Sequence, residues 1–189
     1  MYFGAGTNNT FEDLIFNATN TGGQSITLQY ATTISSVTIN ASGEQSVNMN
    51  NNVMTIDDFT LNYSKNTIIT PDVFIGGNKT FTNTFTINSS GTLKVSLRTH
   101  GNNTFNVFYV GNRMDRWEIQ ANTTQTITDL KPIIGTCEQP ILITSSSLGT
   151  QGTISQASGT VTGDYLHCRT TMQPVVLHLA PPTLPTWVM

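Results

Sequence analysis

The chain has 189 residues, of which only 8 are Lys or Arg and 11 are Asp or Glu, so its formal net charge is -3. Charged residues make up 10% of the chain, whereas Thr, Asn and Ser number 33, 19 and 14. The lack of clustered Lys and Arg excludes a nucleic-acid-binding surface. No apolar run approaches the roughly 18 residues that a membrane span requires, so membrane insertion is excluded as well.

Hydrophobic and polar residues alternate in several segments, as in β-strands with one buried face. The first such segment, Phe11–Phe16, is compatible with either a short helix or a first strand. Thr fills many outward positions, because a β-branched side chain suits a pleated, half-exposed surface. In chain order, the residues expected to face inward are Ile26, Leu28, Tyr30, Phe81, Phe85, Ile87, Leu93, Val95, Leu97, Trp117, Ile119, Val175, Leu177 and Leu179.

Clusters of Gly, Asn and Ser separate these segments and mark turns. Short strands that are separated by frequent turns are typical of an antiparallel sandwich or barrel. No internal repeat of fixed period is visible, so a solenoid or a propeller is not expected. We therefore expect an all-β fold, an antiparallel two-sheet sandwich in the form of a single jelly roll with extended terminal arms.

The expected domain organisation is an N-terminal arm at 1–20, a β-sandwich domain at 21–173, and a final strand with a proline-rich docking tail at 174–189. The first residues lack the basic and apolar regions of a secretory signal. The prolines of the tail are incompatible with a helix or a central strand, so we expect the tail to dock on a partner. The interface candidates are Tyr2, Phe3, Pro181, Pro182, Leu184, Pro185 and Trp187.

The charged residues predict no catalytic group, no cofactor-binding residue and no metal ligand. The pair Asp57-Asp58 is expected in a turn or bulge, with a cation site as the alternative. Asp115 and Glu118 are three residues apart, so on a regular strand they face opposite sides and cannot share one cleft. His100 lies in a turn, where a surface position is expected.

Two further residue types leave alternatives open. Two cysteines, Cys137 and Cys168, are too few for a disulfide framework, so free thiols are expected, with a single bridge as the alternative. Asn-x-Ser/Thr sequences would mean dense glycosylation in a secreted protein, but in a chain this rich in Asn and Thr they are expected to arise by chance. They begin at Asn8, Asn17, Asn40, Asn62, Asn78, Asn88, Asn102 and Asn122.

A charge-poor, Thr- and Asn-rich β chain with ordered end segments and no catalytic constellation resembles the single jelly-roll virion proteins of double-stranded DNA viruses and phages, such as penton, minor capsid and decoration proteins. The resemblance implies a non-enzymatic structural protein, made in the host cytoplasm and assembled in the virion. Its partners would be copies of itself, in a pentamer or trimer, and other capsid proteins.

An alternative class is a receptor-binding or carbohydrate-binding β-sandwich module, either at a phage spike or tail tip or in an extracellular adhesin. Its partner would be a host-surface glycan. The least favoured class is an enzyme, which would bring two carboxylates, or a His and a carboxylate, into one pocket.

Overall fold

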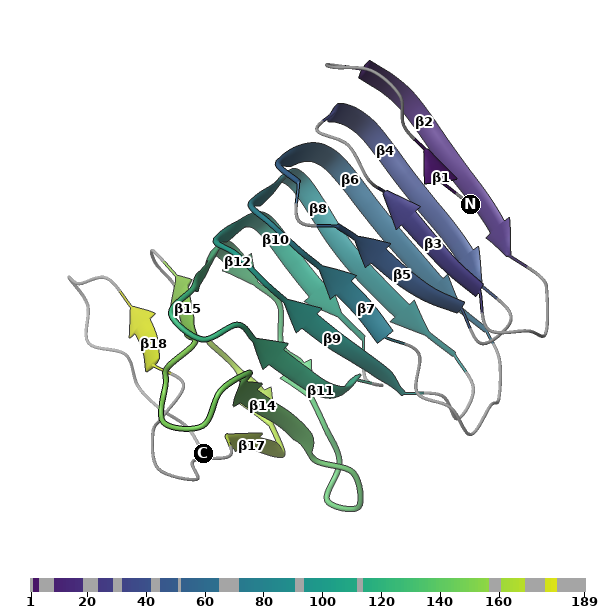
Figure 1. The fold of residues 1–189 in the computed structure, drawn as a ribbon. Coiled ribbons are helices and arrows are strands. Elements are labelled where there is room, and N and C mark those ends of the chain that lie inside the picture. The colour runs from purple at the N-terminus through teal and green to yellow at the C-terminus, as the bar shows by residue number, and fades with distance from the viewer. Residues whose placement is uncertain are drawn as a thin grey trace.

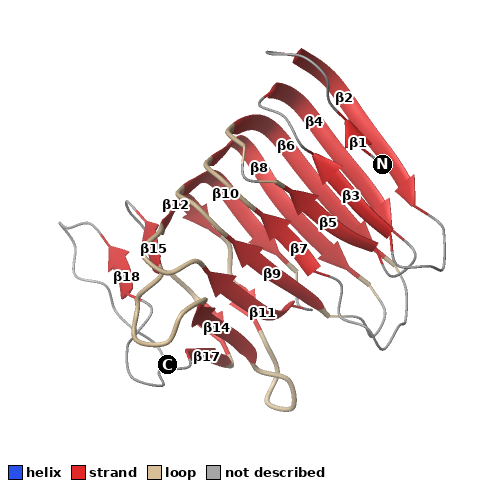
Figure 2. Cartoon of the chain, in the orientation of Figure 1, coloured by secondary structure: helices blue, strands red, loops and turns tan. Residues whose placement is uncertain are grey.

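The computed structural model describes residues 2–3, 9–18, 24–28, 32–41, 45–50, 52–64, 72–90, 94–111, 114–156, 161–168 and 176–179. All regular elements in these ranges are strands (Figure 2), and none of the described residues forms a helix that could cross a membrane. The chain winds as a β-solenoid, alternating between two eight-stranded sheets, here called A and B (Figure 1).

The strands of each sheet follow the order of the chain. Sheet A contains β1 (Tyr2–Phe3), β3 (Gln24–Leu28), β5 (Gln45–Met49), β7 (Asp72–Ile75), β9 (Val95–Thr99), β11 (Met114–Ile119), β14 (Ile141–Ser145) and β17 (Leu166–Cys168). Sheet B contains β2 (Asn9–Ala18), β4 (Thr32–Ala41), β6 (Met54–Tyr63), β8 (Lys79–Ser89), β10 (Asn103–Val110), β12 (Thr124–Leu130), β15 (Thr153–Gln156) and β18 (Val176–Leu179). A third, two-stranded sheet pairs β13 (Ile133–Ile134) with β16 (Gly163–Asp164).

The expected antiparallel sandwich and jelly roll are wrong, because every strand pair among the described residues is parallel. The all-β class is correct. The period-two alternation could not separate the two arrangements, since inward and outward residues alternate in the same way in parallel and antiparallel strands. Consecutive strands lie in opposite sheets, so neighbours within one sheet are a full circuit apart in the chain.

The expectation that the chain forms no solenoid is also wrong, and the length of the circuit explains the error. Paired residues in successive circuits are between 19 residues apart, as for Met114 and Val95, and 30 residues apart, as for Gly163 and Ile133. Loops of different length absorb most of this variation, and register shifts in the pairs β6–β8, β8–β10 and β9–β11 account for single residues of it. A search for a fixed period therefore fails although each circuit repeats the same structure.

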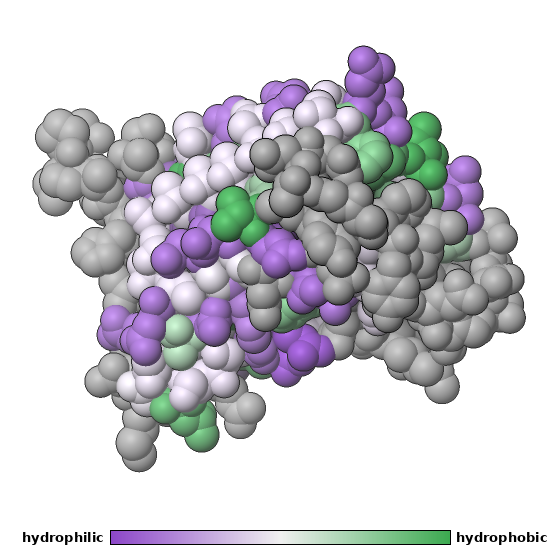
Figure 3. Space-filling view, turned by 45° about the horizontal axis from the view of Figure 1, so that its top comes forward, coloured by the Kyte–Doolittle hydropathy of each residue, from purple (hydrophilic) through white to green (hydrophobic). Residues whose placement is uncertain are grey.

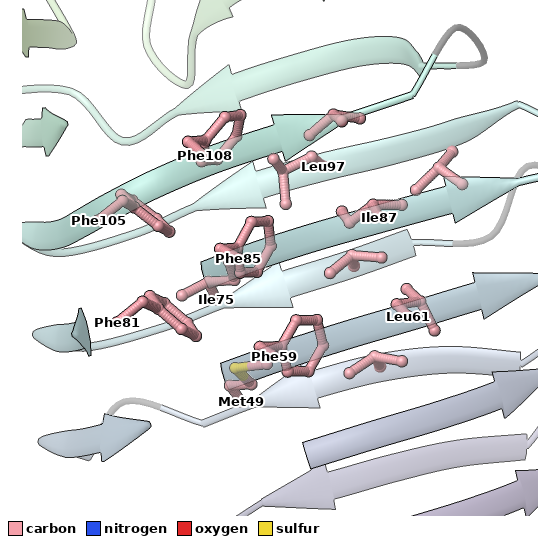
Figure 4. Close-up of a cluster of buried hydrophobic side chains, with 14 of the residues drawn as sticks. Met49, Phe59, Leu61, Ile75, Phe81, Phe85, Ile87, Leu97, Phe105 and Phe108 are labelled. Carbon is pink, nitrogen blue, oxygen red and sulfur yellow. The ribbon is translucent and has the colours of Figure 1, made fainter. Parts of the chain in front are cut away.

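Apolar side chains fill the space between the two sheets, and sheet B contributes aromatic rings at matching positions (Figure 4). The ring of Phe85 stacks on Phe59 at a centroid distance of 5.1 Å and on Phe108 at 5.3 Å. Trp117 of sheet A continues the stack at 4.7 Å from Phe108. Because the strands are parallel and similar residues occupy paired positions, the core consists of columns of stacked side chains.

The corners before β8 and β10 are aligned turns that require glycine. Gly77 and Gly101 have φ values of 75° and 80°, which L side chains rarely adopt. A Cβ atom on Gly101 would lie 2.1 Å from the carbonyl oxygen of Gly77. The close stacking of these two turns, both expected from the Gly-Asn sequences, therefore depends on the absence of a side chain.

The positions of individual residues follow the alternation closely. Phe11–Phe16 belongs to β2, so the strand alternative holds. Ser96 lies between the inward-facing Val95 and Leu97, so alternation predicts that it faces water, but it is only 3% exposed. It pairs with Arg116 where β9 and β11 lose regular register. Leu177 and Leu179 lie in β18, and Tyr30, Leu93 and Val175 are outside the described residues. The inward positions that are confirmed as buried are Ile26, Leu28, Phe81, Phe85, Ile87, Val95, Leu97, Trp117 and Ile119.

Candidate binding surface

The outer face of sheet B presents a hydroxyl at the same register position in seven successive strands. Thr55, for example, pairs with Thr33 on one side and with Thr80 on the other. These side chains are exposed or half-buried, and within the described part of the chain none of their hydroxyls has a protein hydrogen-bond partner. We call this set the hydroxyl column; its members are Thr10, Thr33, Thr55, Thr80, Thr104, Thr126 and Ser155.

A second column, near the ends of β2, β4, β6 and β8, consists of four asparagines. The amide Nδ2 of Asn88 donates to Oδ1 of Asn62 at 3.0 Å, Asn62 donates to Asn40 at 2.8 Å, and Asn40 donates to Asn17 at 2.8 Å. Each amide thus uses its neighbour in the next strand. This asparagine column differs from the hydroxyl column because its polar atoms are bonded to each other.

These four asparagines each begin an Asn-x-Ser/Thr sequence, and others mark the opposite ends of strands in sheet B. Oδ1 of Asn78 accepts a hydrogen bond from the backbone N–H of Asn102 at 2.9 Å, and Oδ1 of Asn102 accepts one from Thr124 at 2.9 Å. The interpretation of these sequences as chance is thus replaced by a structural one: they recur because equivalent corners of the solenoid use Asn in the same way.

The carboxylates of β6 lie on the same outer face, where the pairing of β6 with β8 is irregular between Ile56 and Asp58. Asp58 accepts hydrogen bonds from the hydroxyl of Thr84 at 2.6 Å and from Nδ2 of Asn83 at 2.9 Å. Asp57 accepts one from the hydroxyl of Thr82. Asp57 and Asp58 therefore lie within β6, opposite the extra residue of β8, and not in a turn or bulge between two strands as expected. No group of three or more His, Cys, Asp or Glu side chains in the described residues could hold a metal ion.

Sheet A carries charged pairs on its outer face instead of columns. Lys94 lies 3.3 Å from Asp115, and Nε2 of His100 lies 3.9 Å from Oε1 of Glu118. The His100 ring also packs edge-on against Phe74 at 4.9 Å. Asp115 and Glu118 contact different partners and do not converge. The expectation that they face opposite sides is wrong, because β11 loses regular register between Met114 and Arg116 and both carboxylates lie on the outer face. The His100–Glu118 distance is longer than a hydrogen bond.

The sequence analysis missed one buried charged side chain, Lys79, which is 1% exposed. Its Nζ donates hydrogen bonds to the backbone carbonyls of Asn50, at 2.8 Å, and of Asn52 and Gly76. Burial lowers the pKa of Lys79 from 10.5 to about 8. A signal for this position did exist, because Lys79 is two residues before the inward-facing Phe81 and therefore shares its face.

Of the residues proposed for interfaces, the structure describes only two. Tyr2 and Phe3 form β1, at the edge of sheet A, where they pair with β3. Cys137 is an exposed free thiol, in agreement with the expected free cysteines at that position. The remaining interface candidates, Pro181, Pro182, Leu184, Pro185 and Trp187, are outside the described residues.

The outer face of sheet B is therefore a continuous surface on which equivalent residues repeat from strand to strand. In the view of Figure 3, the described surface is coloured mainly in the white and purple of near-neutral and hydrophilic residues, with a few green patches. Compared with known proteins, the chain matches no family model, no curated protein and no solved structure. The surface itself must therefore carry any functional argument.

Proposed function

We propose that the chain is a non-enzymatic structural protein that acts through protein–protein contacts in a larger assembly, with a virion as its setting. The observation that carries this proposal is the outermost strand of sheet B. The 10-residue strand β2 has only β4 as a partner among the described strands, so no described strand pairs with its second edge. A long open edge presents backbone N–H and C=O groups that favour pairing with another chain.

The composition of this strand supports the same proposal. Ile15 of β2 is 65% exposed, and the strand contains no proline and no lysine, while its two charged residues, Glu12 and Asp13, leave the other eight positions neutral. The scarcity of charge over the whole chain also lowers the cost of covering its surface, because a buried charge must be paired to be tolerated. A second copy of the chain, in a ring of identical contacts, is the partner that we propose.

Light scattering of the purified chain tests this proposal. We expect an oligomer that the edge variant Ile15→Lys converts to monomers, since an added charge on an edge strand opposes pairing. The matched control is Thr38→Lys, in the same column one strand further inside the sheet. A wild-type monomer at all concentrations, or equal dissociation of both variants, would refute the proposal.

A second candidate function is attachment to a glycan. The specific observation in its favour is the hydroxyl column, whose hydroxyls have no hydrogen-bond partner among the described residues.

A further inference from the structure

We propose that the hydroxyl column is a binding site for a neutral polysaccharide chain, which lies across the strands of sheet B along the axis of the solenoid. This inference rests on the second candidate function, attachment to a glycan, for which it specifies the site and the class of polymer, and it does not depend on the assembly role of the edge strand. It rests on three properties of the column, namely its regular spacing, its unused hydrogen-bonding groups and its lack of charge.

The spacing of the column follows from parallel pairing. Neighbouring strands lie about 4.8 Å apart, so the seven hydroxyls from Thr10 to Ser155 span roughly 29 Å. Each hydroxyl can donate one hydrogen bond and accept two. A linear polymer that repeats a hydroxyl-bearing unit can therefore contact successive strands in the same way, which a compact small molecule cannot do.

The hydroxyl column is the longest row of hydroxyls on this face that have no hydrogen-bond partner among the described residues, since the row Thr38, Thr60 and Thr86 covers only three strands before Ile15 and Tyr109 interrupt it. The asparagine column is bonded internally, and Asp57 and Asp58 are occupied by side chains of β8. Six of the seven members of the hydroxyl column are Thr, whose β-branched side chain has few χ1 rotamers. Such side chains lose little conformational entropy when they bind a ligand.

Charge determines the class of polymer. No member of the hydroxyl column is charged, while sheet B carries acidic side chains nearby along the same strands, among them Asp13, Asp58 and Asp129. An anionic polymer would be repelled by these carboxylates. A neutral polysaccharide meets no such repulsion, and its hydroxyls are matched by those of the column.

Affinity electrophoresis with soluble polymers tests this inference. The neutral probes are laminarin, hydroxyethylcellulose and dextran, and alginate is the anionic probe. We expect at least one neutral probe to retard the wild-type chain and alginate not to do so. The triple variant Thr33→Val, Thr55→Val and Thr80→Val keeps the side-chain shape but removes three hydroxyls, so affinity should fall at least about tenfold.

The control triple Thr38→Val, Thr60→Val and Thr86→Val removes three hydroxyls from the same three strands, in a row that Ile15 and Tyr109 interrupt, and this row is too short to follow a polymer across the sheet. The control should therefore leave binding unchanged. Serine at positions 33, 55 and 80 should restore binding, because it restores the hydroxyls. If the valine triple fails to fold, Thr55→Val alone should still weaken binding about threefold. Wild type that no neutral probe retards, retardation by alginate as strong as by a neutral probe, or equal losses in both triples would overturn the inference. Light scattering reports the assembly role separately.

Discussion

The outer faces of the two sheets differ in which residues occupy paired positions in neighbouring strands. On sheet B, residues of one kind are stacked strand after strand, as in the hydroxyl column and the asparagine column. On sheet A, unlike residues follow one another, and Glu118 pairs in register with Arg98, which pairs with Phe74 on its other side. Both faces cover the same core and are built from the same circuits of chain.

The difference shows which charged residues can occupy paired positions in parallel, in-register strands. Stacking identical residues is favourable for hydroxyls and amides, but identical charges opposite each other are destabilising. Sheet B avoids this by placing Ser36 between Asp13 and Asp58, and the hydroxyl of Ser36 donates to Asp13 at 2.5 Å. Sheet A instead places opposite charges side by side. A repetitive neutral face and a mixed charged face therefore result from two ways of avoiding the same repulsion.

The largest expected effect concerns the stacked aromatic rings of the core, which test whether like residues in successive strands stabilise the fold. Phe85→Ala removes a ring that stacks on two others, so we expect the free energy of unfolding to fall by about 3–5 kcal/mol. The control is Phe74→Ala on the outer face of sheet A, where the half-buried ring contacts His100 and the loss should be much smaller. Urea unfolding followed by circular dichroism measures both. Equal losses would show that stacking within sheet B has no special weight.

A smaller effect is expected from Lys79→Met, which replaces the buried ammonium with the residue found at the paired position 54. The variant keeps an apolar side chain of similar length but leaves three backbone carbonyls without their donor. Unsatisfied buried groups are costly, so the free energy of unfolding at pH 7 should fall by roughly 1–3 kcal/mol. A variant as stable as the wild type would mean that the free-energy cost of burying the ammonium equals the stabilisation from its hydrogen bonds.

The same pair of proteins has a predicted pH dependence. Because burial lowers the pKa of Lys79 to about 8, the native state releases this proton at lower pH than the unfolded state, whose pKa is near 10.5. Between these values the unfolded state binds more protons, so this group makes the wild type more stable as the pH rises. The stability difference between wild type and Lys79→Met should grow between pH 8 and 10, and a constant difference would contradict the shifted pKa.

The sequence predicted the strands and the core but not their arrangement. Residues such as Phe81, Phe85 and Trp117 were placed inward correctly because alternation reports burial directly. Strand direction depends on pairing between residues a full circuit apart, and alternation carries no information about it. The jelly-roll expectation came from short strands and frequent turns, which a solenoid with variable loops also shows.

The circuit of the solenoid, and with it the asparagine column, could have been found by comparing the positions of the Asn-x-Ser/Thr sequences. The Asn-x-Ser/Thr sequences at Asn17, Asn40, Asn62 and Asn88 each follow an apolar residue near the end of a strand, and their recurrence marks the circuit. Because these sequences were regarded as glycosylation signals or chance, the repeat was missed. The hydroxyl column could not be located without the register, since Thr is common throughout the chain.

The smallest expected effect on stability comes from asparagine-to-alanine variants, which compare the outer faces of the two sheets at the same residue type. Asn62→Ala removes the hydrogen bonds that Asn62 makes with Asn40 and Asn88, so the free energy of unfolding should fall by about 1 kcal/mol. The matched variant on sheet A is Asn48→Ala, because Oδ1 of Asn48 is buried without a hydrogen-bond partner in the described part of the protein. Removing that unsatisfied group should leave stability unchanged or slightly increased, as chemical denaturation would show. Equal losses at both positions would mean that the asparagines contribute through the general polarity of an outer face. A larger loss for Asn62→Ala than for Asn48→Ala is expected because an asparagine stabilises the solenoid only where an asparagine in the next strand forms a hydrogen bond with it.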